Sequence, residues 1–261
     1  MRVSVVIPAL NEAAYIGRTL EALAQETEPK EILVVDGGST DATTARAERH
    51  GARVLAGPRG RGRQMNAGAA RASGEVLFFL HADTLPPPGA LALIRQTLAD
   101  PSAEAGAFRL AFDHPTPLLR FYGFCTRLPW PAICFGDRGL FVRRPVFEAL
   151  GGFSEAPLFE DLDLVRRLHR RGGFRFRPEH VVTAARRFEA HGALRQQLRN
   201  LRLWLHFLRG TDPHRLAHLY PYPETPTEAG GSRVAHHVGR RGGERPHTPH
   251  HAPPQSQGLE L

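Results

Sequence analysis

A single acidic residue, Asp83, stands just after the most apolar stretch of the chain. Residues 76–80, VLFFL, read as a central β-strand buried on both faces, bounded by Gly74 and by three prolines at 86–88. In open α/β sheets, ligands bind beyond the carboxyl ends of the strands. A carboxylate there can hold a divalent metal ion against a diphosphate, because hard cations prefer oxygen ligands. The alternative is that Asp83 only caps the turn before the prolines.

A second acidic group begins a predicted helix over 158–171. Glu160, Asp161 and Asp163 fall in its first turn, where the helix dipole alone favours negative charge. A carboxylate held at a helix start near a cleft is also a good general base. The spacing alone leaves both the structural and the catalytic interpretation open.

The segment 57–63, GPRGRGR, combines three glycines with three arginines. Backbone amides and arginine forks of this kind can cradle phosphate, although a solvated basic loop is the more common outcome. The segment lacks the lysine and the spacing of a P-loop, and no G-x-G-x-x-G motif follows the first predicted strand. A dinucleotide-binding fold therefore has little support.

The elements that would position these residues alternate between strand and helix. Apolar runs at 3–8, 31–36 and 52–56 predict strands joined by helices, with Asn11 as a helix cap. This rhythm predicts a parallel sheet with right-handed crossovers. Later segments predict helices over 64–73, 89–98, 117–128 and 145–150, strands over 105–112 and 136–142, and edge strands over 174–177 and 180–184.

The composition is that of an ordinary soluble protein with excess positive charge. The chain has 261 residues and a formal net charge of +8, and Lys30 is its only lysine. Arginine suits phosphate and carboxylate, which admits anionic small molecules, nucleic acid or an acidic membrane as partners. We expect no nucleic-acid partner, because the basic residues form no recognisable nucleic-acid module.

The expected compartment is a reducing one. Two cysteines, Cys125 and Cys134, make neither a disulfide framework nor a zinc site. No secretory signal pattern is visible at Met1, and no apolar run approaches the ~20 residues that a membrane helix needs. These features predict a cytoplasmic protein.

The C-terminal part of the chain changes character twice. A helix predicted over 192–209 interleaves leucines with arginines. Packing of its apolar side on the core is favoured, and a peripheral contact with anionic lipid on the inner face of the cell membrane is the alternative. Proline, glycine and histidine dominate beyond it, which predicts a domain over 1–209 and a disordered tail over 210–261.

Four motifs, taken in order, resemble those of the family 2 glycosyltransferases: VVIPALNE (5–12), VVDGGSTD (34–41), FLHADT (79–84) and FED (159–161). The resemblance covers roughly residues 2–208. It implies the GT-A fold, an α/β sandwich with a Rossmann-like, mostly parallel central sheet that binds nucleotide sugars. The sequence of residues 61–84 further resembles that of a small bacterial subgroup labelled arsenosugar-biosynthesis glycosyltransferases.

The resemblance implies a role for each matching residue. Asp83 would be the ligand of Mg²⁺ or Mn²⁺ in a D-x-D motif whose first aspartate is replaced here by His81, a change that puts the strength of metal binding in doubt. Asp161 would be the catalytic base, with Glu160 beside it. The substrate-binding residues would be Pro8, Ala9, Asn11, Glu12, Asp36, Arg63, Asn66, His81 and Asp137.

The implied reaction is an inverting, metal-dependent transfer of one sugar from a nucleoside-diphosphate sugar, UDP- or GDP-linked, to a hydroxyl of a small molecule or lipid. A single transfer is expected because the Q-x-x-R-W motif of the family's processive synthases does not occur here. One alternative is a nucleotidyltransferase acting on a sugar phosphate. The other is a non-catalytic protein that binds nucleotide sugars or a membrane surface.

Overall fold

The computed structural model describes residues 1–114, 116–130, 134, 136–186 and 193–219. The chain divides into a compact unit, Met1–Pro221, and a second unit, Tyr222–Leu261, that lies outside the described residues. Most of the predicted tail over 210–261 therefore falls outside them, while residues 210–219 include a short helix, α10 (Pro213–Ala217). The predicted boundary after residue 209 stays a prediction.

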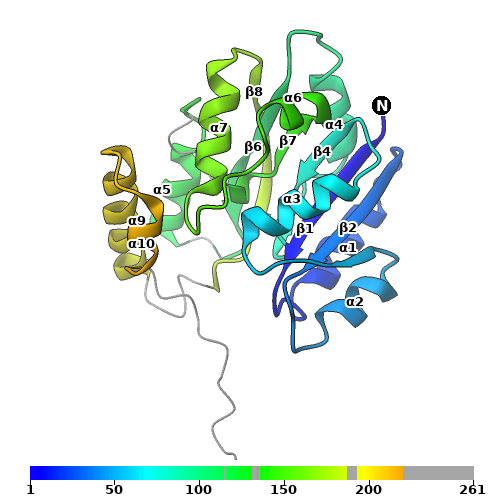
Figure 1. The fold of residues 1–261 in the computed structure, drawn as a ribbon, viewed down its shortest axis with the longest axis horizontal. Coiled ribbons are helices and arrows are strands. Elements are labelled where there is room, and N and C mark those ends of the chain that lie inside the picture. Colours follow the sequence, from blue (N-terminus) through cyan, green and yellow to red (C-terminus); the bar gives the residue numbers. More distant parts are fainter. Residues whose placement is uncertain (115, 131–133, 135, 187–192, 220–261) are drawn as a thin grey trace, which may run out of the picture. The chain divides into compact units, whose positions relative to one another are not determined.

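One mixed sheet runs through the compact unit (Figure 1), with the strand order β3-β2-β1-β4-β7-β6-β8-β5. The pairs β1–β2, β2–β3 and β1–β4 are parallel, as the strand–helix rhythm predicts, whereas β7 runs antiparallel to β4 and β6. The predicted α/β fold is confirmed. The strands are β1 (Val3–Ala9), β2 (Lys30–Asp36), β3 (Arg53–Ala56), β4 (Val76–Phe79), β5 (Thr84–Leu85), β6 (Ala105–Phe112), β7 (Leu140–Arg143) and β8 (Phe174–Thr183).

Helices cover both faces of the sheet. Because side chains alternate along a strand, Val5 and Ile7 of β1 belong to one core with α1 and α4, and Val6 belongs to a second core with α3, α6 and α7. Burial on both faces explains why the central strands read as continuous apolar runs. The helices are α1 (Ile16–Ala24), α2 (Thr43–Arg49), α3 (Arg61–Arg71), α4 (Ala90–Thr97), α5 (Pro117–Cys125), α6 (Arg144–Ala149), α7 (Glu160–Arg170) and α9 (Ala193–Leu208).

The helix predicted over 192–209 corresponds to α9 and forms its own small core with α10. Leu203 and Leu216 are buried there together with Leu158, against the rings of Phe159 and Phe207. Other leucines of α9 remain exposed. Within the described ranges, no helix is both long and apolar enough to cross a membrane.

The prediction of two edge strands over 174–177 and 180–184 was wrong. A single ten-residue strand, β8, lies between β6 and β5. Its register with β6 shifts between Ala107 and Arg109, opposite a segment that contains Pro178. A proline cannot donate to the ladder, and a bulge lets the strand continue past it.

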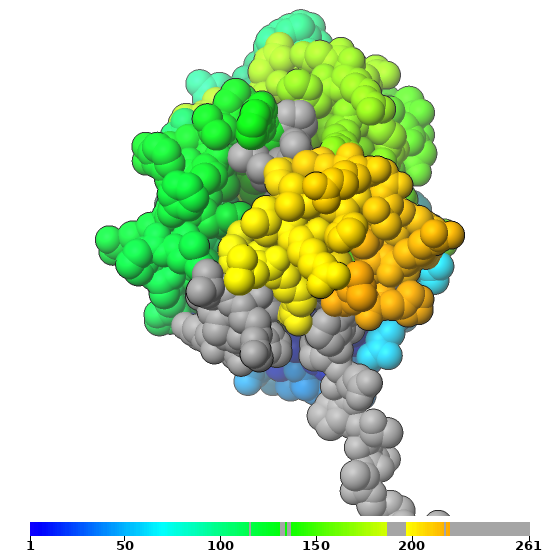
Figure 2. Space-filling model, turned by 90° about the vertical axis from the view of Figure 1, so that its left-hand side faces the viewer, coloured from blue at the N-terminus to red at the C-terminus, as the bar shows by residue number. Residues whose placement is uncertain are grey.

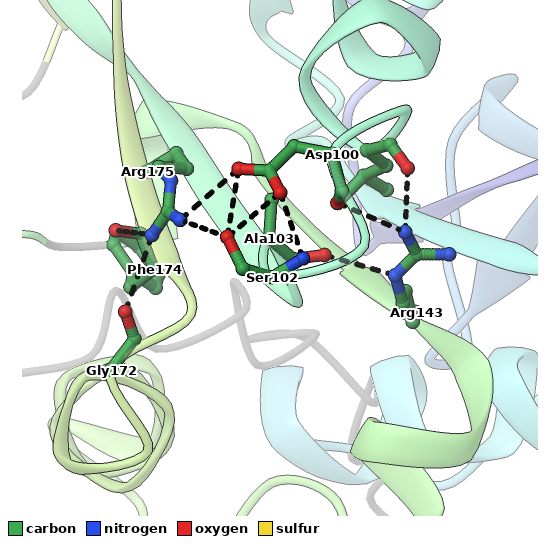
Figure 3. A network of polar contacts seen from close by, with 8 residues as sticks. Asp100, Ser102, Ala103, Arg143, Gly172, Phe174 and Arg175 are labelled. Carbon is green, nitrogen blue, oxygen red and sulfur yellow. Dashed lines mark hydrogen bonds and ion pairs between the residues drawn. The ribbon is translucent and has the colours of Figure 1, made fainter.

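A polar network holds together the end of the sheet where β4 begins (Figure 3). Arg143, at the end of β7, donates to the carbonyl of Ala103 at 2.9 Å, and Arg175 of β8 contacts Ser102 at 2.7 Å and Asp100 at 3.3 Å. Arg143 pairs with the first residue of β4, so this network lies opposite the carboxyl end of that strand. Part of the arginine content therefore stabilises the fold itself.

Candidate functional site

The carboxyl end of β4 is where two of the predicted acidic residues meet. Asp83 lies in the segment after this strand, separated from its last residue, Phe79, by Leu80, His81 and Ala82. Because β7 runs antiparallel to β4, with Leu140 opposite Phe79, the short turn η2 (Gly136–Arg138) before β7 lies at the same edge. That turn carries Asp137. The sheet thus brings together carboxylates from two neighbouring strands.

Asp83 is paired with an arginine that the sequence motifs did not indicate. Nη2 of Arg186 donates to Oδ2 of Asp83 at 2.8 Å and to Oε1 of Glu12 at 2.5 Å, and its guanidinium lies 4.5 Å from the ring centre of Tyr15. Burial lowers the pKa of Arg186, but the hydrogen bond to Glu12 and the charges of Asp83 and Glu12 outweigh burial and raise it. Arg186 therefore stays charged.

Asp83 is a single carboxylate of the kind that can hold a metal ion together with phosphate. No cluster of three or more His, Cys, Asp or Glu suited to a metal occurs in the described part of the chain. His81 is half-buried, and its carbonyl accepts from the amide of Thr84 at 3.1 Å. Mg²⁺ is commonly held by one or two carboxylates plus substrate phosphates. Asp83 can supply such a carboxylate.

The acidic pair at the start of α7 is almost fully buried. Glu160 is 2% exposed and pairs with Nε of Arg61 at 3.1 Å, and Asp161 is 6% exposed and accepts from the amide of Leu162 at 2.7 Å. Burial raises the pKa of Glu160, Arg61 opposes this rise, and the charge of Asp161 adds to it. The predicted phosphate loop thus gives one of its arginines to this pair.

Asp137 lies in the electrostatic field of Asp161 and Asp83. Burial raises its pKa to about 7, and the charge of Asp161 adds to this effect while Arg138 opposes it. Its Oδ1 atom is buried and has no hydrogen-bond partner among the residues that the structure describes. Arg138 is itself buried and anchors the turn through the carbonyls of Phe108 at 2.8 Å and Thr126 at 2.9 Å. Asp137 can therefore change protonation near neutral pH.

The loops after β1 and β2 are joined to each other by side chains. Asn11 has a left-handed backbone, with φ 55°, and its Oδ1 accepts from the amide of Thr40 at 2.9 Å. The carboxylate of Asp36 accepts from the amides of Gly38 and Ser39, each at 3.0 Å. Asn11 and Asp36, both predicted for the nucleotide pocket, thus shape one preformed cradle, the β1–β2 cradle.

Gln64 holds the base of this cradle, and no sequence signal marked it. Its Nε2 donates to the carbonyls of Ala9 and Val35, both at 2.8 Å, and its side chain is 3% exposed. A Cβ atom at Gly37 would come within 3.0 Å of this amide. The predicted residues Pro8 and Ala9 are buried in β1, and Ala9 acts here through its backbone. The cradle therefore depends on a side chain from α3.

Arg63 and Asn66 lie at a separate shallow hollow, with Pro58 and Glu155. Arg63 pairs with Glu155 at 2.9 Å, and both side chains are exposed. Asn66 exchanges two hydrogen bonds of 2.9 Å with the backbone of Phe153. Their predicted donor-binding role stays a prediction, because the hollow beside Asp83 has a different lining: Tyr15, Arg18, Thr19, Leu85, Asp113, Val182 and Ala184.

Known proteins share this sequence pattern. The model of glycosyl transferase family 2 matches residues 4–153. A probable glycosyltransferase of Bacillus subtilis, YdaM, is 31% identical over 209 residues, which are 69% of this chain and 50% of that protein. A beta-monoglucosyldiacylglycerol synthase of Synechocystis is 27% identical over 195 residues, 64% of this chain and 40% of that protein. The chain spans half or less of the length of these curated relatives.

The fold is also similar to that of solved structures. A mannosyltransferase of Pyrobaculum calidifontis, in complex with GDP-Man and Mn²⁺, superposes with a TM-score of 0.62 at 23% identity, over 84% of this chain and 69% of that chain. The family model covers more than half of the present sequence. The chain therefore belongs to glycosyl transferase family 2.

Proposed function

We propose that this protein is an inverting, metal-dependent glycosyltransferase that moves one sugar from a nucleoside-diphosphate sugar to an acceptor hydroxyl. The main support is that Asp83 and Asp137 both lie at the carboxyl end of β4, and that the charge of Asp161 acts on Asp137. A cradle for a ligand stands at the neighbouring ends of β1 and β2. In open α/β sheets, ligands bind at the carboxyl ends of the strands.

The donor would bind with its nucleoside in the β1–β2 cradle and its diphosphate toward Asp83. The similarity to a mannosyltransferase that binds GDP-Man and Mn²⁺ supports this class of donor. A Mg²⁺ or Mn²⁺ ion held by Asp83 and the donor phosphates would supply Lewis-acid stabilisation of the departing diphosphate. UDP- and GDP-linked sugars are both candidate donors.

Asp161 is proposed as the base because it is the residue that matches the family motif, and Glu160 beside it pairs with Arg61 at 3.1 Å. Asp161 takes the proton of the acceptor hydroxyl while that oxygen attacks the anomeric carbon. The bond from this carbon to the diphosphate breaks on the opposite face, so the configuration inverts. Asp137, with its pKa near neutrality, can present either a donor or an acceptor to the bound substrate.

The experiment that tests this function is product analysis with Asp161→Asn. The wild type should release a nucleoside diphosphate, and the variant should bind the donor normally but transfer no sugar. Release of pyrophosphate from a nucleoside triphosphate would instead identify a nucleotidyltransferase. Nucleotide-sugar binding without turnover by the wild type, across acceptor hydroxyls of both small molecules and lipids, would favour a non-catalytic protein.

A peripheral membrane contact through the 192–209 helix is part of this proposal. Figures 1 and 2 show α9 beside α5, and we call the exposed apolar side chains of α9, of α5 and of the segment that follows α5 the docking face. Across 116–130 and 193–219, seven arginines accompany one acidic residue, Asp212, which suits anionic lipid. The similarity to a beta-monoglucosyldiacylglycerol synthase also favours this contact. The docking face consists of Phe121, Phe124, Leu128, Trp130, Leu198, Leu201, Leu205 and Leu208.

The acceptor and the location are proposed on narrower grounds. The sequence of residues 61–84 favours an acceptor of the arsenosugar-biosynthesis type. Turnover of an arsenic-containing acceptor would test this assignment. A cytoplasmic location is favoured by Cys125 and Cys134, which are both free thiols in the structure.

A further inference from the structure

Arg186 occupies the oxygen atoms that a metal ion would need. Its Nη2 nitrogen binds Oδ2 of Asp83 and Oε1 of Glu12 at the same time, at 2.8 and 2.5 Å. The two carboxylates therefore lie close enough to share one cation. Their side chains are only 14% and 16% exposed, so little water is present to screen their mutual repulsion.

The backbone on the N-terminal side of Arg186 is anchored. The amide of Ala184 donates to the carbonyl of Asp83 at 3.1 Å, and the amide of Ala185 donates to the carboxylate of Asp113 at 2.8 Å. The guanidinium also lies over the ring of Tyr15. The backbone contacts just after β8 therefore fix this position, which is not a chance approach of a long side chain.

We propose that Arg186 is an exchangeable counter-cation for Asp83, which competes with a divalent metal ion and makes metal binding depend on the donor diphosphate. The inference rests on the proposed function, because it takes Asp83 as the metal ligand. One carboxylate oxygen cannot serve a guanidinium and a metal ion equally well. A diphosphate changes this balance, because it offers the metal further oxygen ligands and the arginine an anionic partner.

The proposal has an unusual consequence for the free protein. Without Arg186, Asp83 loses the cation with which its carboxylate pairs, and a divalent ion can replace the missing charge. Removing a positive charge should therefore strengthen the binding of metal alone. A residue with only a structural role at this place would not have this effect.

The experiment measures Mn²⁺ binding to the unliganded protein by electron paramagnetic resonance of the free ion. We expect Arg186→Gln to bind Mn²⁺ about tenfold or more tightly than the wild type. The control is Arg18→Gln, which removes the same charge beside the same hollow without an Arg18–Asp83 ion pair to break, and should change binding little. Adding Asp83→Asn to Arg186→Gln should abolish the gain.

Several results would overturn the proposal. The first is that Arg186→Gln binds Mn²⁺ no more tightly than the wild type, although its circular-dichroism spectrum and melting temperature are native. The second is an equal gain in Mn²⁺ affinity in Arg18→Gln. The third is a gain in Mn²⁺ affinity that persists when Asp83→Asn is added. If Arg186→Gln does not fold, a second measurement decides: Mn²⁺ affinity of the wild type should rise when UDP or GDP is added, and an unchanged affinity despite nucleotide binding refutes the exchange. Failure of the proposed function is distinct, because the wild type would then release no nucleoside diphosphate from any nucleotide sugar, whatever its affinity for Mn²⁺.

Discussion

The ring of Phe207 in α9 stacks on the ring of Phe159, with centroids 4.7 Å apart and planes 30° from parallel. Phe159 has a left-handed backbone, with φ 62°, and directly precedes Glu160 and Asp161. Such a backbone in a bulky residue persists only where its surroundings hold it. Helix α9 therefore helps to fix the turn that presents the acidic pair.

We expect Phe207→Ala to lower turnover while donor affinity stays unchanged, because the stack supports α7 and not the β1–β2 cradle. The free energy of unfolding should fall by about 1–3 kcal/mol. Phe207→Leu keeps an apolar contact and serves as the control, with a smaller loss of both turnover and stability. Steady-state kinetics and calorimetry of donor binding check this. A loss confined to donor affinity would contradict it.

Gln64→Leu should weaken nucleotide binding and destabilise the fold. The change leaves the carbonyls of Ala9 and Val35 without the amide that joins them, which costs about 1–3 kcal/mol for a buried group. The matched control is Gln96→Leu, at an exposed position of α4. Urea unfolding and nucleotide titration measure both effects. Equal behaviour of the two variants would show that Gln64 does not support the cradle.

Asp137 makes stability depend on pH. Its folded-state pKa of about 7 exceeds its ordinary value of 3.8, so its contribution is present below pH 4 and is lost as the pH rises toward and through about 7. Asp137→Asn cannot ionise. The variant should therefore gain stability relative to the wild type between pH 4 and pH 8, by a total on the order of 4 kcal/mol. Urea unfolding across this range tests the expectation, and a difference independent of pH would refute it.

The sequence could predict the parallel half of the sheet, because apolar runs mark buried strands. It could also predict that Asp83 follows a strand and that Asp161 lies in the first turn of a helix, because the residues around each of them show where these elements end or begin. Pairings between distant segments could not. Arg186 meets Asp83 across 103 residues of sequence, and nothing in its local sequence distinguishes it from the other arginines.

Irregularities of the backbone could not be predicted from the sequence pattern either. The bulge that carries β8 past Pro178 depends on its pairing with β6, which no local periodicity reveals. The helix predicted from residue 64 begins at Arg61, because the glycine-rich segment before it continues into the helix instead of ending as a loop. This earlier start lies beside Glu160: a Cβ atom at Gly62 would come within 3.2 Å of its Cγ.

The docking face should bind anionic vesicles. We expect the protein to sediment with phosphatidylglycerol vesicles, to sediment poorly with phosphatidylcholine, and to be released at high salt. Leu201→Asp should reduce binding, whereas Ala92→Asp, which adds the same charge at an exposed position of α4, should not. The contrary result is that the wild type binds no vesicles and forms a dimer, while Leu201→Asp is monomeric. That result would show that a second copy of the chain covers this face.

The most direct test of the central claim is calorimetric binding of UDP, GDP and their sugars, with and without Mn²⁺, to the wild type and to Asp83→Ala. The account predicts that one nucleotide binds in a metal-dependent manner and that this dependence disappears in the variant. Absence of binding of any nucleotide, with or without metal, would contradict the claim that this edge of the sheet is a donor site.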